Sequence, residues 1–283
     1  MEKWNLVIDV ARCENCNNCV LAAKDEYVGN EFPSYSAPHV SQGAGVFRIE
    51  RHVRGATPMV DAAYVPVACN HCDDAPCIRA AGDGSIRKRT DGIVIIDPTL
   101  SRGRRDLVAA CPYGAIAWNE TLQVPQQWIF DAHLLDAGAP APRCVAVCPT
   151  GAIEATKLDD GAMQLRAQQD GLRVLRPELG TRPRIWYRNL DRVDRDFIGG
   201  SVSEVRGGVI DCVDGAEVQL EREGEVIAST RTDGFGDFRF DGLERARSDY
   251  LVRVRHAGQE QILGVELNNA SVYLGEIRFE RGD

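Results

Sequence analysis

The chain carries ten cysteines, and eight of them fall into a pattern with recognisable chemistry. Tight C-x2-C-x2-C triplets and cysteine–proline pairs are the spacing by which thiolates hold [4Fe–4S] clusters, and one ligand of each cluster comes from a remote part of the chain. Two triplets and two remote cysteines make two complete sets of four ligands. The eight residues are Cys13-x2-Cys16-x2-Cys19, Cys69-x2-Cys72-x4-Cys77, Cys111-Pro112 and Cys148-Pro149.

The first triplet lacks the fourth cysteine that usually completes a C-x2-C-x2-C-x3-C run, because position 23 is Ala23. Two four-cysteine zinc sites are the alternative use of eight cysteines. Zinc sites normally come as paired C-x2-C knuckles, so the triplets and the cysteine–proline pairs favour clusters. Ala23 then raises the question of which further clusters the chain has lost.

Three other residues near the pattern have open interpretations. His71 lies between two ligands in the stretch CNHC, where a hydrogen bond or a charge would tune a cluster potential. A solvated loop histidine is at least as good an interpretation. Cys144 is expected to be an inert buried thiol, and Cys212 a small core residue in a strand.

Composition restricts the class of protein. The formal net charge is -9, and arginines alternate with acids, so a nucleic-acid partner is not expected. No apolar run approaches the roughly 20 residues that span a bilayer, and the first residues, MEKWNLVIDVARC, lack the apolar stretch of a secretory signal. We therefore expect a cytoplasmic protein without a membrane span. Its thiols would stay reduced there and serve as ligands rather than form disulfides.

The first 160 residues are loop-rich, and an internal repeat organises them. Strands are predicted at 5–10 and 92–97 and a helical piece near 104–110, too little periodic apolar surface for a core without metal. Cys111 begins CPYGAIAW and Cys148 begins CPTGAIEA, which indicates two related half-units. In each, the proline should end a helix and the glycine should allow a tight turn into a strand.

The rest of the chain has a different pattern. We expect an extended connector at 161–200, where prolines interrupt the sequence, and a small β-sandwich at 201–283 built from seven short alternating strands. The stretch TDGFGDFRFDGL (232–243) resembles carboxypeptidase-regulatory or transthyretin-like sandwich domains. The predicted fold class is α+β, a duplicated bacterial-ferredoxin-like domain at 1–160 followed by an all-β sandwich.

Residues 1–160 resemble the four-cluster iron–sulfur subunits of molybdopterin oxidoreductases of the dimethyl sulfoxide reductase superfamily. The resemblance implies how the cysteines pair. We call these groups the first and second thiol sets: Cys13, Cys16, Cys19 and Cys148; and Cys69, Cys72, Cys77 and Cys111.

The same resemblance implies that two further clusters are lost. Their ligand positions are occupied by residues that we call the Ala23 set and the Ala81 set. In the Ala23 set one cysteine remains, Cys144. Asp131 could offer an oxygen ligand to iron, but this interpretation is not favoured because Trp128 lies in the same set. The missing cysteines all belong to these two sets, whereas the two thiol sets are complete. This distribution argues that the two complete sets are retained for use. The sets are Ala23, Trp128, Asp131 and Cys144; and Ala81, Ser101, Arg104 and Leu107.

Within the superfamily the chain resembles, over nearly its full length, the small subunits of pyrogallol–phloroglucinol transhydroxylase and resorcinol hydroxylase. Stretches that carry the resemblance include NLVIDVARCENCNNC, CNHCDDAPC and RPELGTRPRIWYRNL. It implies a heterodimer or larger complex with a large subunit that holds the active site and a molybdenum bis-molybdopterin guanine dinucleotide and acts on hydroxylated aromatics. The transhydroxylase subunit is three-cluster, so loss of the Ala23 site is a departure.

The expected function is electron transfer, because the sequence contains no Gly-rich phosphate loop and no nucleophile–base pair in a known context. This chain would be the non-catalytic subunit that relays electrons through two clusters. One alternative is a structural scaffold whose clusters carry no turnover electrons. Another is a diffusing ferredoxin, for which the connector and the sandwich would have no use.

Overall fold

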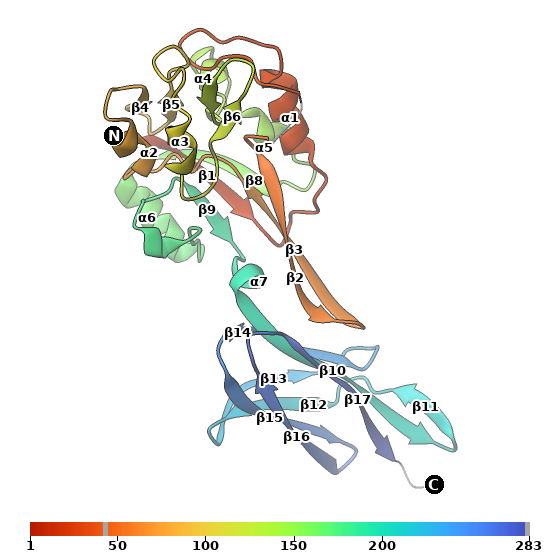
Figure 1. Ribbon diagram of the computed structural model, residues 1–283. Coiled ribbons are helices and arrows are strands. Elements are labelled where there is room, and N and C mark those ends of the chain that lie inside the picture. The colour runs from red at the N-terminus through yellow and green to blue at the C-terminus, as the bar shows by residue number, and fades with distance from the viewer. Residues whose placement is uncertain (42–44, 281–283) are drawn as a thin grey trace. The chain divides into compact units, whose positions relative to one another are not determined.

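The structure, a computed structural model, describes residues 1–41 and 45–280 (Figure 1). The chain divides into two compact units, and each is described by itself. Unit 1 is Met1–Arg51 with Tyr64–Leu190, and unit 2 is His52–Ala63 with Asp191–Asp283.

The main sheet of unit 1 has three strands. Its middle strand, β1 (Lys3–Asp9), pairs antiparallel with β8 (Ile153–Leu158) and parallel with β9 (Ile185–Arg188). The run Leu6-Val7-Ile8 is buried throughout, as expected of a strand covered on both faces. One cover is α6 (Asp160–Gln169), whose Met163 and Ala167 pack against Val7.

The Cys-Pro repeat folds as its sequence predicts. Helix α3 (Asp106–Ala109) ends just before Cys111, and α5 (Arg143–Ala146) ends just before Cys148. The glycine three residues after each cysteine has φ 60°, a backbone conformation that glycine adopts at little cost. Strands β6 (Ala117–Asn119) and β8 follow these turns.

Further helices and strands lie in residues 1–190 (Figure 1), and the tip of the β2–β3 hairpin, His52–Ala63, belongs to unit 2. Two small antiparallel hairpins join β4 to β5 and β6 to β7, and a longer hairpin joins β2 to β3. These elements are α1 (Asn18–Tyr27), β2 (Arg48–Ala56), β3 (Met59–Val67), α2 (Pro76–Ala81), β4 (Ile86–Lys88), β5 (Val94–Ile96), β7 (Val124–Gln126), α4 (Ala132–Asp136) and η1 (Pro177–Leu179).

The segment 161–200, predicted as an extended connector, contains regular structure instead. Helix α6 and strand β9 lie in it, and β9 is hydrogen-bonded to β1. The helix begins at an Asp159 cap whose side chain accepts the Ala162 N–H at 2.9 Å. The prolines lie after α6, around η1, so they interrupt only the loop. The domain boundaries at 160 and 200 stay predictions.

Unit 2 contains two four-stranded sheets. Strand β10 is the centre of one, where it pairs antiparallel with β11 and β14 and parallel with β17. The other sheet has the order β13-β12-β15-β16. The elements are α7 (Asp191–Asp194), β10 (Arg195–Arg206), β11 (Val209–Cys212), β12 (Glu217–Arg222), β13 (Glu225–Arg231), β14 (Asp237–Glu244), β15 (Ser248–His256), β16 (Gln259–Leu267) and β17 (Val272–Glu280).

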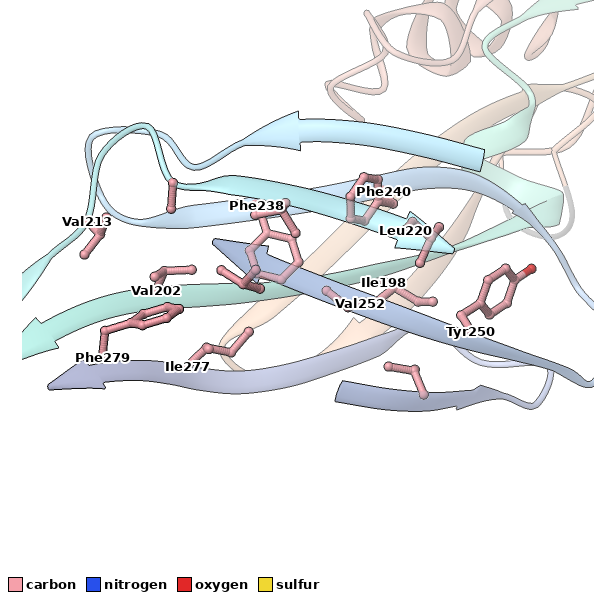
Figure 2. Packing of buried hydrophobic residues seen from close by; sticks show 14 of the residues in the cluster. Ile198, Val202, Val213, Leu220, Phe238, Phe240, Tyr250, Val252, Ile277 and Phe279 are labelled. Carbon is pink, nitrogen blue, oxygen red and sulfur yellow. The ribbon is translucent and has the colours of Figure 1, made fainter. Parts of the chain in front are cut away.

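The two sheets of unit 2 share one apolar core, to which alternate residues of both contribute (Figure 2). Phe238 and Phe240 from one sheet and Val252 from the other lie in it. All seven strands predicted after 201 form, and the mostly-β character of this part agrees with the sequence. The specific sandwich type stays a prediction.

Two features of unit 2 differ from expectation. Cys212 lies in a strand but is exposed rather than a core residue, because all four residues of β11 are exposed at the edge of its sheet. The long strand β10 was not predicted. Its Gly199-Gly200 pair looks like a turn in the sequence, but a Cβ at Gly199 would collide with the Met59 sulfur and one at Gly200 would lie 3.0 Å from the Phe238 ring.

Two further observations concern the whole described chain. All ten cysteines are free thiols. In the described ranges, no helix has the length and apolar character required to cross a membrane.

Candidate metal centre

The second thiol set lies around one pocket in unit 1. Its first two cysteines follow the end of β3, its third lies in the first turn of α2 beside Pro76, and its fourth follows α3. Val94, Tyr113 and Ile116 complete the apolar lining. The structure thus brings together four side chains that are up to 42 residues apart in the chain: Cys69, Cys72, Cys77 and Cys111.

Burial makes three of these thiols, Cys69, Cys72 and Cys77, poor acids in the absence of a positive centre. It raises the pKa of Cys69 well above its ordinary value and, with the charges of Cys111 and Cys72, raises the pKa of Cys77 to about 11. Iron–sulfur clusters bind thiolates, and metal binding releases the protons. A donor set of four converging thiols in an apolar pocket therefore fits a cluster, whose iron would stabilise the deprotonated form.

The first thiol set is more open to solvent. Cys19 is buried on α1, whereas Cys16 is exposed, and Cys13 and Cys148 are half-buried. Burial, followed by the charges of Cys13, Cys16 and Cys148, raises the pKa of Cys19 to about 12. The Asn18 side chain, next to Cys19, donates to the Val147 carbonyl at 3.3 Å, so the residue before Cys148 lies beside the start of α1.

Each Cys-Pro loop donates a backbone hydrogen bond to its own sulfur. The Ala115 N–H donates to Cys111 Sγ at 3.4 Å, and the Ala152 N–H donates to Cys148 Sγ at 3.2 Å. In both repeats the donor is the fourth residue after the cysteine. Hydrogen bonds to cluster sulfurs stabilise negative charge there and tune the reduction potential, so the Gly-Ala of the repeat has a chemical role besides the turn.

His71 is not a solvated loop residue, which corrects one of the two sequence interpretations. It is 1% exposed, and its Nδ1 accepts the Val94 N–H at 3.0 Å. Its ring makes edge contacts with Trp128 and Phe130, at centroid distances of 5.7 and 5.5 Å. Burial lowers the pKa of His71 to about 3, so the imidazole is neutral near pH 7 and supplies no charge to the second thiol set.

A lysine, unlike the neutral His71, places a positive charge beside the second thiol set. The Lys88 ammonium donates to the carbonyl oxygens of His71 at 2.8 Å and Cys72 at 2.9 Å, and it pairs with Asp73 at 2.8 Å. Burial lowers the pKa of Lys88, and the pair with Asp73 opposes that shift. Sequence reasoning missed Lys88 because it lies 16 residues after Cys72, on β4, and no spacing rule connects the two.

The Ala23 set is filled by aromatic packing. Trp128 is 1% exposed and contacts Phe47 and Phe130, at centroid distances of 5.1 and 4.9 Å. Ala23 and Tyr27 are buried one turn apart on α1. The indole ring and its aromatic neighbours therefore supply apolar packing at a place where the family scheme would put a cluster.

Asp131, also in this set, is a buried hydrogen-bond acceptor. Its Oδ1 accepts the Tyr27 hydroxyl and the Trp128 Nε1–H, the latter at 3.2 Å, and its Oδ2 accepts the Arg143 N–H at 2.7 Å. Both oxygens are thus engaged by the protein, and the expectation that Asp131 is not an iron ligand stays a prediction. Cys144 is 3% exposed, as predicted for a buried thiol.

The Ala81 set is filled by aliphatic side chains and an arginine. Leu107 is fully buried and belongs to the same apolar cluster as Ala81 and the buried cysteines of the second thiol set. Arg104 pairs with Asp83 at 2.7 Å and Asp106 at 2.8 Å. Ser101 is buried too.

Within the described residues, no group of three or more His, Cys, Asp or Glu side chains is arranged to hold a single metal ion.

Comparison with known proteins supports the chemistry of these cysteines. Residues 60–158 match the family described as 4Fe-4S dicluster domain. This range contains the second thiol set, Cys144 and Cys148. The thiols and this match together define the class of protein. It is a 4Fe–4S iron–sulfur protein with a ferredoxin-like domain.

Three relatives narrow the class. The sequence is 40% identical to pyrogallol hydroxytransferase small subunit of Pelobacter acidigallici, over 98% of this chain and 100% of that protein. It is 32% identical to a tetrathionate reductase subunit of Salmonella typhimurium (67% and 73% covered) and 31% identical to the thiosulfate reductase electron transfer subunit of Salmonella typhi (57% and 80% covered). The protein therefore belongs to the family of iron–sulfur electron-transfer subunits of oxidoreductases that includes the pyrogallol hydroxytransferase small subunit.

Proposed function

We propose that this chain is the electron-transfer subunit of a molybdopterin-dependent hydroxylase or transhydroxylase and that it holds two [4Fe–4S] clusters. The observation that carries the proposal is that the second triplet and the distant Cys111 line one pocket, and that each cysteine–proline loop donates a backbone N–H to its own sulfur. Each cluster, when bound, takes up or releases one electron. The ligands would be the first thiol set (Cys13, Cys16, Cys19 and Cys148) and the second (Cys69, Cys72, Cys77 and Cys111).

The proposed partner is a large subunit that contains the active site and a molybdenum bis-molybdopterin guanine dinucleotide. The nearly full-length similarity to the pyrogallol hydroxytransferase small subunit supports this choice and a substrate of the hydroxylated aromatic class, such as resorcinol or pyrogallol. We propose a cytoplasmic heterodimer or larger complex. In unit 2, we propose a transthyretin-like or carboxypeptidase-regulatory-like sandwich.

Electron counting favours a hydroxylase. Hydroxylation with water releases two electrons per turnover, whereas transhydroxylation has no net redox change. Two one-electron clusters accept two electrons, so the chain would serve as a short outlet or store. Because the Ala23 and Ala81 sets hold no cluster in this proposal, we do not assume a continuous four-cluster relay.

A scaffold subunit is the competing function, supported by the dependence of loop-rich unit 1 on bound metal for its folding. The two functions separate in an anaerobic titration of the assembled complex with resorcinol and pyrogallol, in which the electron paramagnetic resonance signal of reduced clusters is measured. We expect at least one cluster to become reduced by substrate. If dithionite reduces both clusters and neither substrate reduces any, the chain is a scaffold.

A further inference from the structure

A cation from strand β4 is hydrogen-bonded to the ligand loop of the second thiol set. Lys88 uses all three ammonium donors there, two on the carbonyls of His71 and Cys72 and one on Asp73. Its side chain is 20% exposed. The amine is thus held against the loop that contains Cys69 and Cys72, in a place where water screens its charge only partly.

Neighbouring charges do not cancel the Lys88 charge. Asp73 also accepts hydrogen bonds from Arg184 and from Lys3, the latter at 3.3 Å, and these two cations share Asp160 as a second carboxylate. Three cations therefore face two carboxylates, which leaves a net positive charge beside the second thiol set. The nearest histidine, His71, is neutral, as described above.

The first thiol set has a different environment. Cys16 is exposed to solvent. Arg12 and Glu14 flank Cys13 with opposite charges, both residues are exposed, and Arg12 donates to the Thr150 carbonyl in the Cys148 loop. The charges beside the first set therefore oppose each other and are screened by solvent, whereas a partly buried group with a net positive charge lies beside the second.

Reduction adds one negative charge to an iron–sulfur cluster, and a nearby cation stabilises the reduced form more than the oxidised form. We propose that Lys88 is a positioning residue that raises the reduction potential of the cluster held by the second thiol set, so that this cluster is the electron sink of the chain. The inference rests on the proposed function. In the step it describes, one electron leaves the reduced cluster of the first set and enters the oxidised cluster of the second, and no bond forms or breaks.

The test is a potentiometric titration of the assembled complex with dithionite and redox mediators, which needs no substrate. A Cys111→Ser variant, which lacks a ligand of the second set, assigns the signals. In Lys88→Met, we expect the second cluster to become harder to reduce by at least tenfold in its electron-exchange equilibrium, which is 59 mV for a one-electron couple. The first cluster should keep its potential, and Lys88→Arg should stay near the parent value.

The matched control is Lys157→Met, which removes an exposed lysine of β8 from the same unit. If Lys88→Met keeps about eight irons and shifts the second cluster no more than Lys157→Met does, the inference is wrong although the proposed function stands. If Lys88→Met loses iron, Lys88→Gln, which retains amide donors for the two carbonyls, is titrated instead. Loss of the cluster in both, with retention in Lys88→Arg, would reduce Lys88 to a structural role and overturn the inference. Fewer than eight irons in the parent complex would instead contradict the proposed function.

Discussion

The two thiol sets differ from the Ala23 and Ala81 sets, which lack most or all of their cysteines, in what fills the space around them. The second thiol set surrounds a pocket, and burial raises the pKa values of its Cys69, Cys72 and Cys77, which call for a positive centre. In the Ala23 and Ala81 sets, Trp128 and Leu107 are almost or fully buried. If these two sets hold no cluster, as we propose, the comparison teaches that the space of an absent cluster needs packing of another kind, because bound metal contributes folding energy to such loops.

The Ala23 and Ala81 sets also differ from each other. In the Ala23 set, a buried carboxylate, Asp131, satisfies donors from Tyr27, Trp128 and Arg143. In the Ala81 set, Leu107 supplies the buried volume and Arg104 pairs with partly exposed acids. Substitution of the buried carboxylate Asp131 should therefore cost more stability than substitution of Arg104.

The largest effect is expected from removal of a cluster ligand. Cys111→Ser should reduce the iron content of the purified complex from about eight to about four per chain, because the fourth ligand of the second set is lost. Unit 1 should also become more susceptible to proteolysis. The control is Cys212→Ser, at an exposed position in unit 2, which should change neither property. An unchanged iron content in Cys111→Ser would contradict the proposed ligand set.

The next largest effect is expected at Trp128. Trp128→Ala removes a side chain that is 1% exposed, and such truncations cost about 3–5 kcal/mol of stability. The urea midpoint for loss of the cluster absorbance should fall, although the purified variant should retain about eight irons. Trp128→Phe is the matched control, and its urea midpoint should fall less than that of Trp128→Ala. If Trp128→Ala lost four irons per chain, the Ala23 set would be a metal site after all.

The third largest effect is expected at Asp131. Asp131→Ala leaves the Tyr27 hydroxyl, the Trp128 N–H and the Arg143 N–H without their acceptor, and a single unsatisfied buried donor costs about 1–3 kcal/mol. Asp131→Asn retains one acceptor oxygen and should recover part of the loss. Hydrogen exchange of the α1 and α5 amides measures the effect. Equal protection in Asp131→Ala and the parent would show that these hydrogen bonds contribute little.

The smallest effect is expected at Arg104. Its ion pairs are solvent-accessible, and such pairs contribute little to stability. Arg104→Ala should leave the urea midpoint of unit 1 nearly unchanged. Leu107→Ala, in the same set but fully buried, should cost about 2–5 kcal/mol. A larger loss in Arg104→Ala than in Leu107→Ala would reverse the account of how this position is filled.

The sequence predicted local features well and long-range ones poorly. Strand β1, the helix–Cys-Pro–turn–strand repeat and the last seven strands follow from short-range patterns. The roles of His71 and Lys88 did not follow, because burial and contact with a loop 16 residues away arise only from tertiary folding. Strand β9 was missed for the same reason, since its partner β1 lies far away in the sequence. Strand β10 pairs with β14 and β17 as well as with the adjacent β11, and its Gly199 packs against Met59, and short-range patterns do not predict these distant contacts.

The most direct test of the two-cluster account is an anomalous diffraction map of the complex, collected at the iron absorption edge. We predict two compact peaks in this chain, each of about four irons, one at Cys13 and Cys148 and the other at Cys69 and Cys111. No iron peak should lie beside Trp128 or Leu107. A third iron peak at either of those residues, or zinc in place of iron at a thiol set, would contradict the account.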